Sequence, residues 1–166
     1  MPEQTLILDK HLQSQSETMA FARQFSPVLK IGDVVTLSGT LGAGKTAFIR
    51  AILQSLIDPE LEVPSPTFNL LLTYDVPGQN VTVYHYDFYR IETSNEVLEL
   101  DIDEAFEEGI TLIEWADRMG PYLPEGYLDI AITPDAKCGV EFRTLSLRGN
   151  KTWQDRLSIL KADSGA

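Results

Sequence analysis

A glycine-rich octapeptide, GTLGAGKT, spans residues 39–46 and fits the phosphate-binding pattern G-x-x-x-x-G-K-[ST]. Glycines let a backbone approach phosphates closely, and the N–H groups of such a loop and of the following helix attract anions. Lys45 would add a point charge beside the β- and γ-phosphates, and Thr46 would place its hydroxyl on Mg²⁺. The predicted nucleotide-binding residues are therefore Gly39, Gly42, Ala43, Gly44, Lys45, Thr46 and Ala47.

A metal site next to this loop needs an acid at the end of an apolar strand, and three acids compete for that role. Asp75 precedes VPGQ, so we interpret it as a residue of a hairpin turn. Glu114 ends the apolar run ITLIE. Asp87 ends VTVYHYD, where strand alternation would place it on one face with His85 and Tyr89, and burying such groups without partners is costly. The pattern alone leaves Asp87 open between a surface acid and a metal ligand.

Two further polar segments accompany these acids. The segment VPSPTF, residues 63–68, has prolines on both sides of Ser65, which favour an extended loop that presents Ser65 and Thr67. A threonine in such a loop senses the γ-phosphate and the metal in other P-loop proteins, although a plain connecting loop is the alternative. Arg90 would face away from Asp87 in a regular strand, so we expect it to anchor the motif or meet a partner.

Hydrophobic periodicity predicts the elements that must position these residues. We expect helices over residues 12–25, 47–57, 94–109 and 153–160, and strands over 32–39, 110–115, 127–133 and 140–149. The segments 68–75 and 80–90 flank a Pro-Gly turn and should form an antiparallel hairpin. The order strand, glycine loop, helix, hairpin, helix, strand predicts an α/β fold with a mixed sheet, formed by residues 1–166 as one domain.

Composition limits the possible partners and compartments. The formal net charge is −12 with only 13 Lys and Arg, which disfavours a dedicated nucleic-acid surface, so any RNA should be held by a partner. Cys138 is the only cysteine, so no intramolecular disulfide forms and a reducing compartment is expected. The first residues are polar and no run of about 18 apolar residues occurs, so we expect a cytoplasmic protein without membrane contact.

Four short sequences, GTLGAGKT, SPTF, HYDFYR and LIEW, occur here in an order and spacing that resemble the TsaE family, also known as YjeE. The resemblance covers roughly residues 16–125 and implies a three-layer P-loop NTPase fold. It also implies that the chain binds ATP and Mg²⁺ and hydrolyses ATP slowly alone. One departure is Thr40, where the family often carries an acid, so no role is transferred to that side chain.

The resemblance also assigns residues. Its Mg²⁺ and catalytic-site acids fall on Asp87 and Glu114, with Thr46 as the hydroxyl ligand, and Thr67 belongs to a switch-like loop. Trp115 would lie beside the nucleotide rather than only pack in the core. The segment SETMAFA, residues 16–22, is similar to the family's first helix, and its threonine, Thr18, would lie near the adenine.

The family ATPase serves TsaB and TsaD, and TsaD transfers threonylcarbamoyl to adenosine 37 of tRNA. The resemblance therefore implies an accessory ATPase that meets tRNA only through this complex and is no transferase itself. An acidic chain can dock on a partner whose basic surface holds the tRNA.

Three alternatives share the phosphate loop. A small-molecule kinase would also need an acceptor site and an arginine-bearing lid, and the arginines form no such cluster. A GTPase should carry an Asn-Lys-x-Asp base reader, but NKTW places Trp153 where the aspartate belongs. A nucleotide-gated binding module, which needs bound ATP but no turnover, is poorly separated from an ATPase by the sequence.

Overall fold

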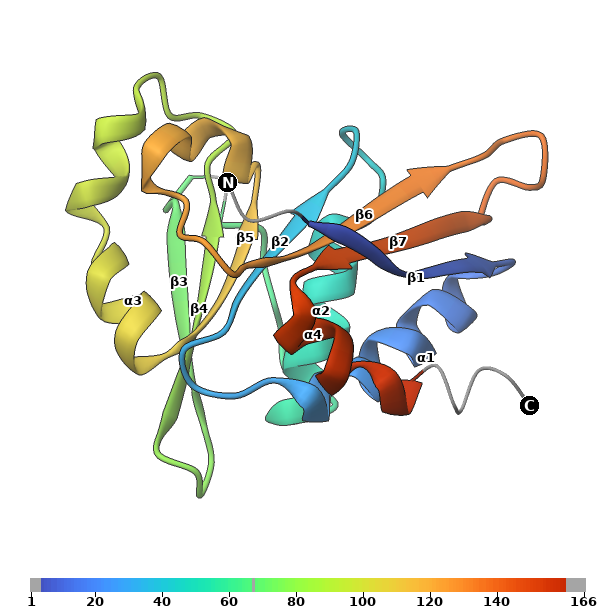
Figure 1. Ribbon diagram of the computed structural model, residues 1–166, viewed down its shortest axis with the longest axis horizontal. Helices are drawn as coiled ribbons and strands as arrows, with labels where there is room; N and C mark the ends of the chain where they lie inside the picture. Colours follow the sequence, from blue (N-terminus) through green and yellow to red (C-terminus); the bar gives the residue numbers. More distant parts are fainter. Residues whose placement is uncertain (1–3, 67, 161–166) are drawn as a thin grey trace.

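The computed structural model describes residues 4–66 and 68–160, and within them seven strands form one mixed sheet in the order β1-β7-β6-β2-β5-β4-β3 (Figure 1). The strands are β1 (Thr5–Leu12), β2 (Val34–Ser38), β3 (Leu71–Val76), β4 (Val81–Asp87), β5 (Ile110–Glu114), β6 (Leu128–Pro134) and β7 (Arg143–Gly149). The α-helices are α1 (Gln15–Phe25), α2 (Lys45–Leu56), α3 (Ile102–Glu108) and α4 (Lys151–Arg156). Three 3₁₀ helices connect them: η1 (Ser26–Val28), η2 (Ser94–Glu99) and η3 (Ala116–Tyr122).

The centre of the sheet is parallel and its edges are antiparallel. Strand β2 pairs in parallel with β5 and β6, and β4 pairs in parallel with β5. Strand β3 then adds antiparallel to β4, while β7 joins β6 and β1 in antiparallel pairs. The predicted α/β class and the predicted hairpin are confirmed.

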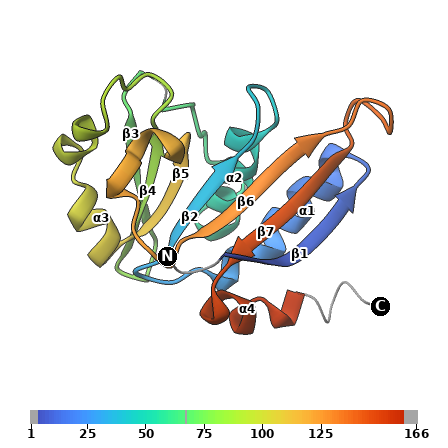
Figure 2. The ribbon, with the colours of Figure 1, turned by 45° about the horizontal axis from the view of Figure 1, so that its top comes forward.

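Two hydrophobic cores cover opposite faces of the sheet. The larger core packs α1, α2 and α4 against the sheet, with Phe21, Phe48 and Trp153 among its buried aromatic residues. The smaller core packs η2, α3 and η3 against β4 and β5, around Tyr86 and Met119. Figures 1 and 2 show α3 beside β3 and β4, away from the group formed by α1, α2 and α4. The result is the expected three-layer arrangement, in which the glycine loop connects the carboxyl end of β2 to the start of α2.

Two predictions about the elements are wrong. The single helix predicted over 94–109 is split into η2 and α3, because Asp101 adopts a left-handed conformation with φ of +55° and interrupts the helix. In the first part of the chain, strand β1 was not predicted. The first helix begins at Gln15 rather than at residue 12, with Ser14 as its N-cap.

The hairpin also differs from the prediction in detail. Asp75 lies inside β3 rather than in the turn, and its carboxylate accepts a hydrogen bond from the Thr82 hydroxyl at 2.8 Å. Strand β4 ends at Asp87, so Tyr89 does not continue the face that carries His85 and Asp87. The reason is local: the Asp87 carboxylate accepts the Tyr89 N–H at 2.9 Å, which turns the chain out of the sheet.

The parallel register brings the site residues to one edge. Leu37 at the end of β2 pairs with Glu114 at the end of β5, and Glu114 pairs with Asp87 at the end of β4. Open α/β sheets bind ligands at the carboxyl ends of their strands. Of the helices in the described part of the chain, none is long and apolar enough to cross a membrane.

Candidate functional site

The loop between β2 and α2 has the backbone of a phosphate cradle. A side chain at Gly39 would place its Cβ 2.6 Å from the carbonyl oxygen of Ile132 in β6, so only glycine fits there. Gly44 has φ of +108° and forms the N-cap of α2. Since the first amides of a helix have no intrahelical acceptors, the start of α2 offers free N–H donors at the mouth of the loop.

Lys45 is folded back onto its own loop. Its ammonium donates to the carbonyl oxygens of Gly39 at 2.6 Å and Thr40 at 3.1 Å, and it lies 4.2 Å from the centre of the Trp115 ring. Only 5% of the residue is exposed. Burial lowers the pKa of the Lys45 ammonium, while the charges of Glu114, Asp87 and the nearby Asp117 oppose that shift.

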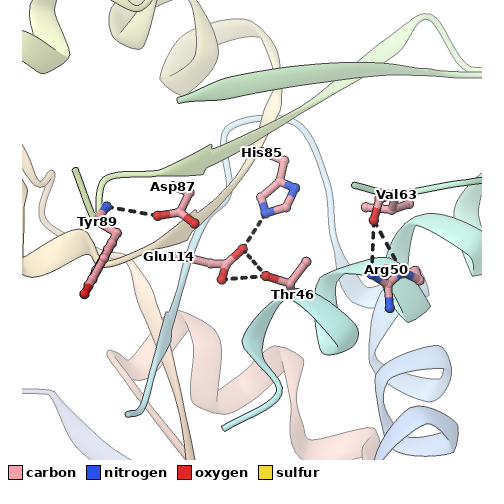
Figure 3. A network of polar contacts seen from close by, with 7 residues as sticks. All are labelled: Thr46, Arg50, Val63, His85, Asp87, Tyr89 and Glu114. Atoms are coloured by element: carbon pink, nitrogen blue, oxygen red, sulfur yellow. Dashed lines mark hydrogen bonds and ion pairs between the residues drawn. The ribbon is translucent and has the colours of Figure 1, made fainter. Parts of the chain in front are cut away.

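Thr46, Glu114 and His85 form a buried hydrogen-bonded chain (Figure 3). The Thr46 hydroxyl lies 2.9 Å from both carboxylate oxygens of Glu114 and donates to them. On the other side, Nε2 of His85 lies 2.8 Å from Oε2 of Glu114. A carboxylate only accepts hydrogen bonds, so Nε2 carries the proton. The structure thus joins the hydroxyl of the phosphate loop to the acid at the end of β5.

Asp87 lies in the next strand, in register with Glu114. The residue is 4% exposed, and its carboxylate accepts the backbone N–H of Tyr89. The Tyr89 ring packs against Trp115 with ring centres 4.9 Å apart, so the tyrosine covers the site rather than lying in the strand. Trp115 itself has a left-handed φ of +60°, which takes the chain away from β5 immediately after Glu114.

Val63 and Phe68, which lie between α2 and β3, each contact an arginine. The guanidinium of Arg50, on α2, donates to the Val63 carbonyl at 3.2 and 3.3 Å, as Figure 3 shows. Arg90 stacks its guanidinium 4.3 Å from the centre of the exposed Phe68 ring, an anchoring contact at the end of the HYDFYR segment. Thr67, predicted as a switch residue, lies outside the described residues.

Two cavities lie on either side of the loop. The first, about 330 Å³, is lined by the acids and the start of α2; its lining includes Lys45, Thr46, Ser65, Asp87, Glu114 and Trp115. The second, about 220 Å³, lies between α1, the loop and the connection from β6 to β7. Thr18 lines this second cavity together with Ala43 and Ala47, and its hydroxyl donates to the Ser14 carbonyl at 3.2 Å.

The structure therefore brings together most of the residues predicted from the sequence. Thr46, Glu114, Asp87, Lys45 and Trp115 line one cavity, and Gly42, Gly44 and Ala47 line both cavities. Three contributions were not predicted: His85 as a partner of Glu114, Arg50 as an anchor of the loop, and Arg143 as a neighbour of Ala43. For the contact between His85 and Glu114, the only signal in the sequence was a histidine two residues before Asp87 in an apolar strand.

The donor set fits Mg²⁺. One hydroxyl and two carboxylates lie at the mouth of the loop, and oxygen atoms are the ligands that Mg²⁺ prefers. Among the described residues, no group of three or more His, Cys, Asp or Glu side chains is arranged to hold a metal alone. Mg²⁺ commonly binds one or two carboxylates and completes its shell with phosphates and water.

The fold and the loop define a protein of the P-loop NTPase class. The family described as "Threonylcarbamoyl adenosine biosynthesis protein TsaE" matches residues 12–142. The chain belongs to the TsaE family.

Individual relatives agree. The chain is 40% identical to the tRNA threonylcarbamoyladenosine biosynthesis protein TsaE of Rickettsia bellii over 72% of this chain and 81% of that protein. It is 39% identical to the Bacillus subtilis protein of the same name, over 70% of this chain and 71% of that protein. The crystal structure of Bacillus subtilis YdiB superposes with a TM-score of 0.73 and 28% identity, covering 100% of this chain and 99% of that one.

Proposed function

We propose that this protein binds and hydrolyses Mg²⁺-ATP as the accessory ATPase of tRNA threonylcarbamoyladenosine formation, acting with TsaB and TsaD partners in the cytoplasm. The observation that carries the proposal is the direct contact between Thr46 of the phosphate loop and Glu114 of β5. Family membership and the names of the relatives supply the pathway.

Different residues of the site bind the phosphates, hold the metal ion and orient its ligand. The loop amides and Lys45 hold the phosphates, which requires Lys45 to leave its carbonyl acceptors at Gly39 and Thr40. Thr46, Glu114 and Asp87 hold Mg²⁺, which neutralises charge on the phosphates. His85 keeps the Glu114 carboxylate turned toward Thr46.

The base has its own place in this proposal. The second cavity begins at Ala43 and Ala47 and ends at Thr18 on α1, so a nucleotide whose phosphates lie in the loop can direct its base there. Trp115 and Tyr89 close the opposite side, next to the acids. Their rings shield the phosphates from solvent, a condition that strengthens electrostatic interactions within the site.

The negative net charge of the chain indicates which partners it can bind directly. With 25 Asp and Glu against 13 Lys and Arg, the chain offers little positive surface for RNA, so tRNA meets it through the complex. A basic partner would instead attract it.

The test is ATP turnover by the purified chain, alone and with the TsaB and TsaD partners and tRNA. We expect slow hydrolysis alone and faster hydrolysis in the complex, abolished in Glu114→Ala. Normal complex assembly and tRNA modification in a variant that binds ATP but cannot hydrolyse it would favour the nucleotide-gated module instead.

A further inference from the structure

Arg143 at the start of β7 holds the phosphate loop from the side opposite the metal ligands. Its Nε donates to the carbonyl oxygen of Ala43 at 2.8 Å. Its Nη1 donates to the carbonyls of Phe142 at 2.8 Å and Val140 at 3.0 Å, which fixes the guanidinium on the connection between β6 and β7. The ion pairs found within residues 4–66 and 68–160 do not include Arg143, so backbone carbonyls are its observed hydrogen-bond partners.

The contact with Ala43 sets the direction of a second group. The carbonyl of Ala43 and the N–H of Gly44 belong to one planar trans peptide, so they point in opposite directions. A carbonyl held toward Arg143 therefore turns the Gly44 N–H away from Arg143 and toward the other side of the loop. Gly44 has φ of +108°, and glycine allows many backbone conformations, so this peptide could rotate without an anchor.

Lys45 anchors the first half of the same loop through the carbonyls of Gly39 and Thr40. That anchor is lost when the Lys45 ammonium moves to a phosphate, whereas Arg143 is not among the described residues that line the cavity beside Lys45 and the acids. The guanidinium therefore remains available to hold the loop when the nucleotide is bound.

We propose that Arg143 is a positioning residue that pre-organises the phosphate loop by holding the Gly44 N–H toward the phosphates. The role presupposes the nucleotide site proposed above and adds a dependence on the connection between β6 and β7. Because it acts on the loop backbone, it should affect every ligand with a polyphosphate group by the same factor, whatever the base.

A competing role is possible in the geometry, since Arg143 also lines the 220 Å³ cavity beside Thr18 and Glu141. A residue that read the base would affect ATP binding only. Inorganic tripolyphosphate, which has no base, separates the two roles.

The experiment measures the dissociation constants of ATP and of tripolyphosphate by calorimetry for the full chain and for Arg143→Met, which keeps an unbranched apolar stem but removes the donors. Charge-assisted hydrogen bonds of this kind correspond to roughly a tenfold to hundredfold change in affinity. We expect both ligands to weaken by a similar factor in that range. The control is Arg148→Met, which removes an exposed arginine of the same strand and should change neither constant more than about twofold.

Unchanged affinities in a folded Arg143→Met would overturn the proposal, and so would weakened ATP binding with unchanged tripolyphosphate binding. If Arg143→Met does not fold, Arg143→Lys replaces it, because lysine keeps the charge but cannot hold three carbonyls in one plane. A wild-type chain that binds neither ligand would instead refute the nucleotide site itself.

Discussion

At the scale of single residues, Glu114 is the centre of the site. It is 3% exposed and is held by two donors, the Thr46 hydroxyl and the His85 ring. A buried carboxylate without partners would be costly, so these contacts stabilise the acid next to the phosphate loop. The sequence predicted Glu114 and Thr46 individually, but their contact depends on how α2 packs behind β5, which periodicity cannot show.

Glu114→Gln should separate binding from hydrolysis. The amide keeps the shape of the side chain but loses the negative charge, so ATP should still bind through the loop amides and Lys45. Mg²⁺-dependent turnover should fall about a hundredfold or more, because a correctly held metal ion contributes several kcal/mol of transition-state stabilisation. Calorimetry without Mg²⁺ and steady-state hydrolysis with Mg²⁺ measure the two effects, and normal hydrolysis would contradict the metal assignment.

His85→Leu should weaken Mg²⁺ binding without removing the nucleotide. Residues that orient a metal ligand typically contribute about tenfold to a hundredfold in metal affinity. The measurement is the Mg²⁺ dependence of ATP affinity, with ATP binding in the absence of metal as the control. His85→Gln, whose amide can donate near the position of Nε2, should recover part of the lost Mg²⁺ affinity. Equal Mg²⁺ affinities in His85→Leu and His85→Gln would argue against an orienting role.

Lys45→Met should bind ATP at least about a hundredfold more weakly, since Lys45 supplies the ammonium among the described residues that line the cavity next to the acids. The variant also loses the contacts of the ammonium with the Gly39 and Thr40 carbonyls and with the Trp115 ring, so the free energy of unfolding should fall as well. Calorimetry reports the affinity and chemical denaturation the stability. ATP binding at the wild-type strength would remove Lys45 from the proposed site.

At the scale of elements, strand β4 joins the core to the site. Its buried tyrosines, Tyr84 and Tyr86, face the smaller core, while His85 and Asp87 face the side of α2. The alternation was predictable from the sequence as far as Asp87. The end of the strand was not, because it depends on the hydrogen bond from the Tyr89 N–H to Asp87.

Physical reasons explain why strand β1 and the break between η2 and α3 were not predicted. Strand β1 is an edge strand with a register irregularity between Leu6 and Leu8, which breaks the alternation that marks a strand. The segment 94–109 keeps helical spacing in its apolar residues, but the left-handed Asp101 divides it. Thr93 and Glu96 form a capping box at the start of η2, so a local signal for the first half existed.

Tyr86→Phe should lower stability near neutral pH and reduce its loss at alkaline pH. The hydroxyl donates to the Leu100 carbonyl at 2.7 Å, and losing one such bond costs about 1 kcal/mol. Burial raises the pKa of Tyr86 above its ordinary value near 10. Above that value the unfolded chain releases this proton while the folded chain retains it, so wild-type stability falls as pH rises.

Urea denaturation below pH ~9 and above pH ~10 measures this difference. Other buried tyrosines share the trend, so the comparison is between the two proteins rather than between the two pH values. The gap between wild type and Tyr86→Phe should narrow at high pH. A gap that widens would contradict the role of the buried hydroxyl.

At the scale of the whole molecule, the chain from β6 onward completes the structure that holds the site. Strand β6 supplies the Ile132 carbonyl that restricts residue 39 to glycine, and β7 supplies Arg143. Helix α4 is fixed by a two-point ion pair of Arg156 with Asp33, at 2.7 and 2.8 Å. Motifs concentrated between residues 16 and 125 could not predict these contributions, because they depend on strand order rather than on local sequence.

Net charge also acts on the whole molecule. With a net charge of −12, the isolated chain should bind tRNA with a dissociation constant of about 0.1 mM or weaker at physiological salt, which is the weak end of non-specific binding. Filter binding or fluorescence anisotropy, with the chain alone and in the presence of its partners, measures this. Tight binding by the isolated chain that survives at high salt would contradict the proposal that a partner holds the tRNA.

The central claim is that Thr46, Asp87 and Glu114 form a Mg²⁺-ATP hydrolysis site on the phosphate loop. The most direct measurement is ATP turnover in the presence of Mg²⁺ and the TsaB and TsaD partners, for the wild type and for Glu114→Gln at saturating ATP. We expect turnover by the wild type and near-background turnover by the variant, with the ATP affinity of the variant retained. Equal turnover by the two proteins would contradict it.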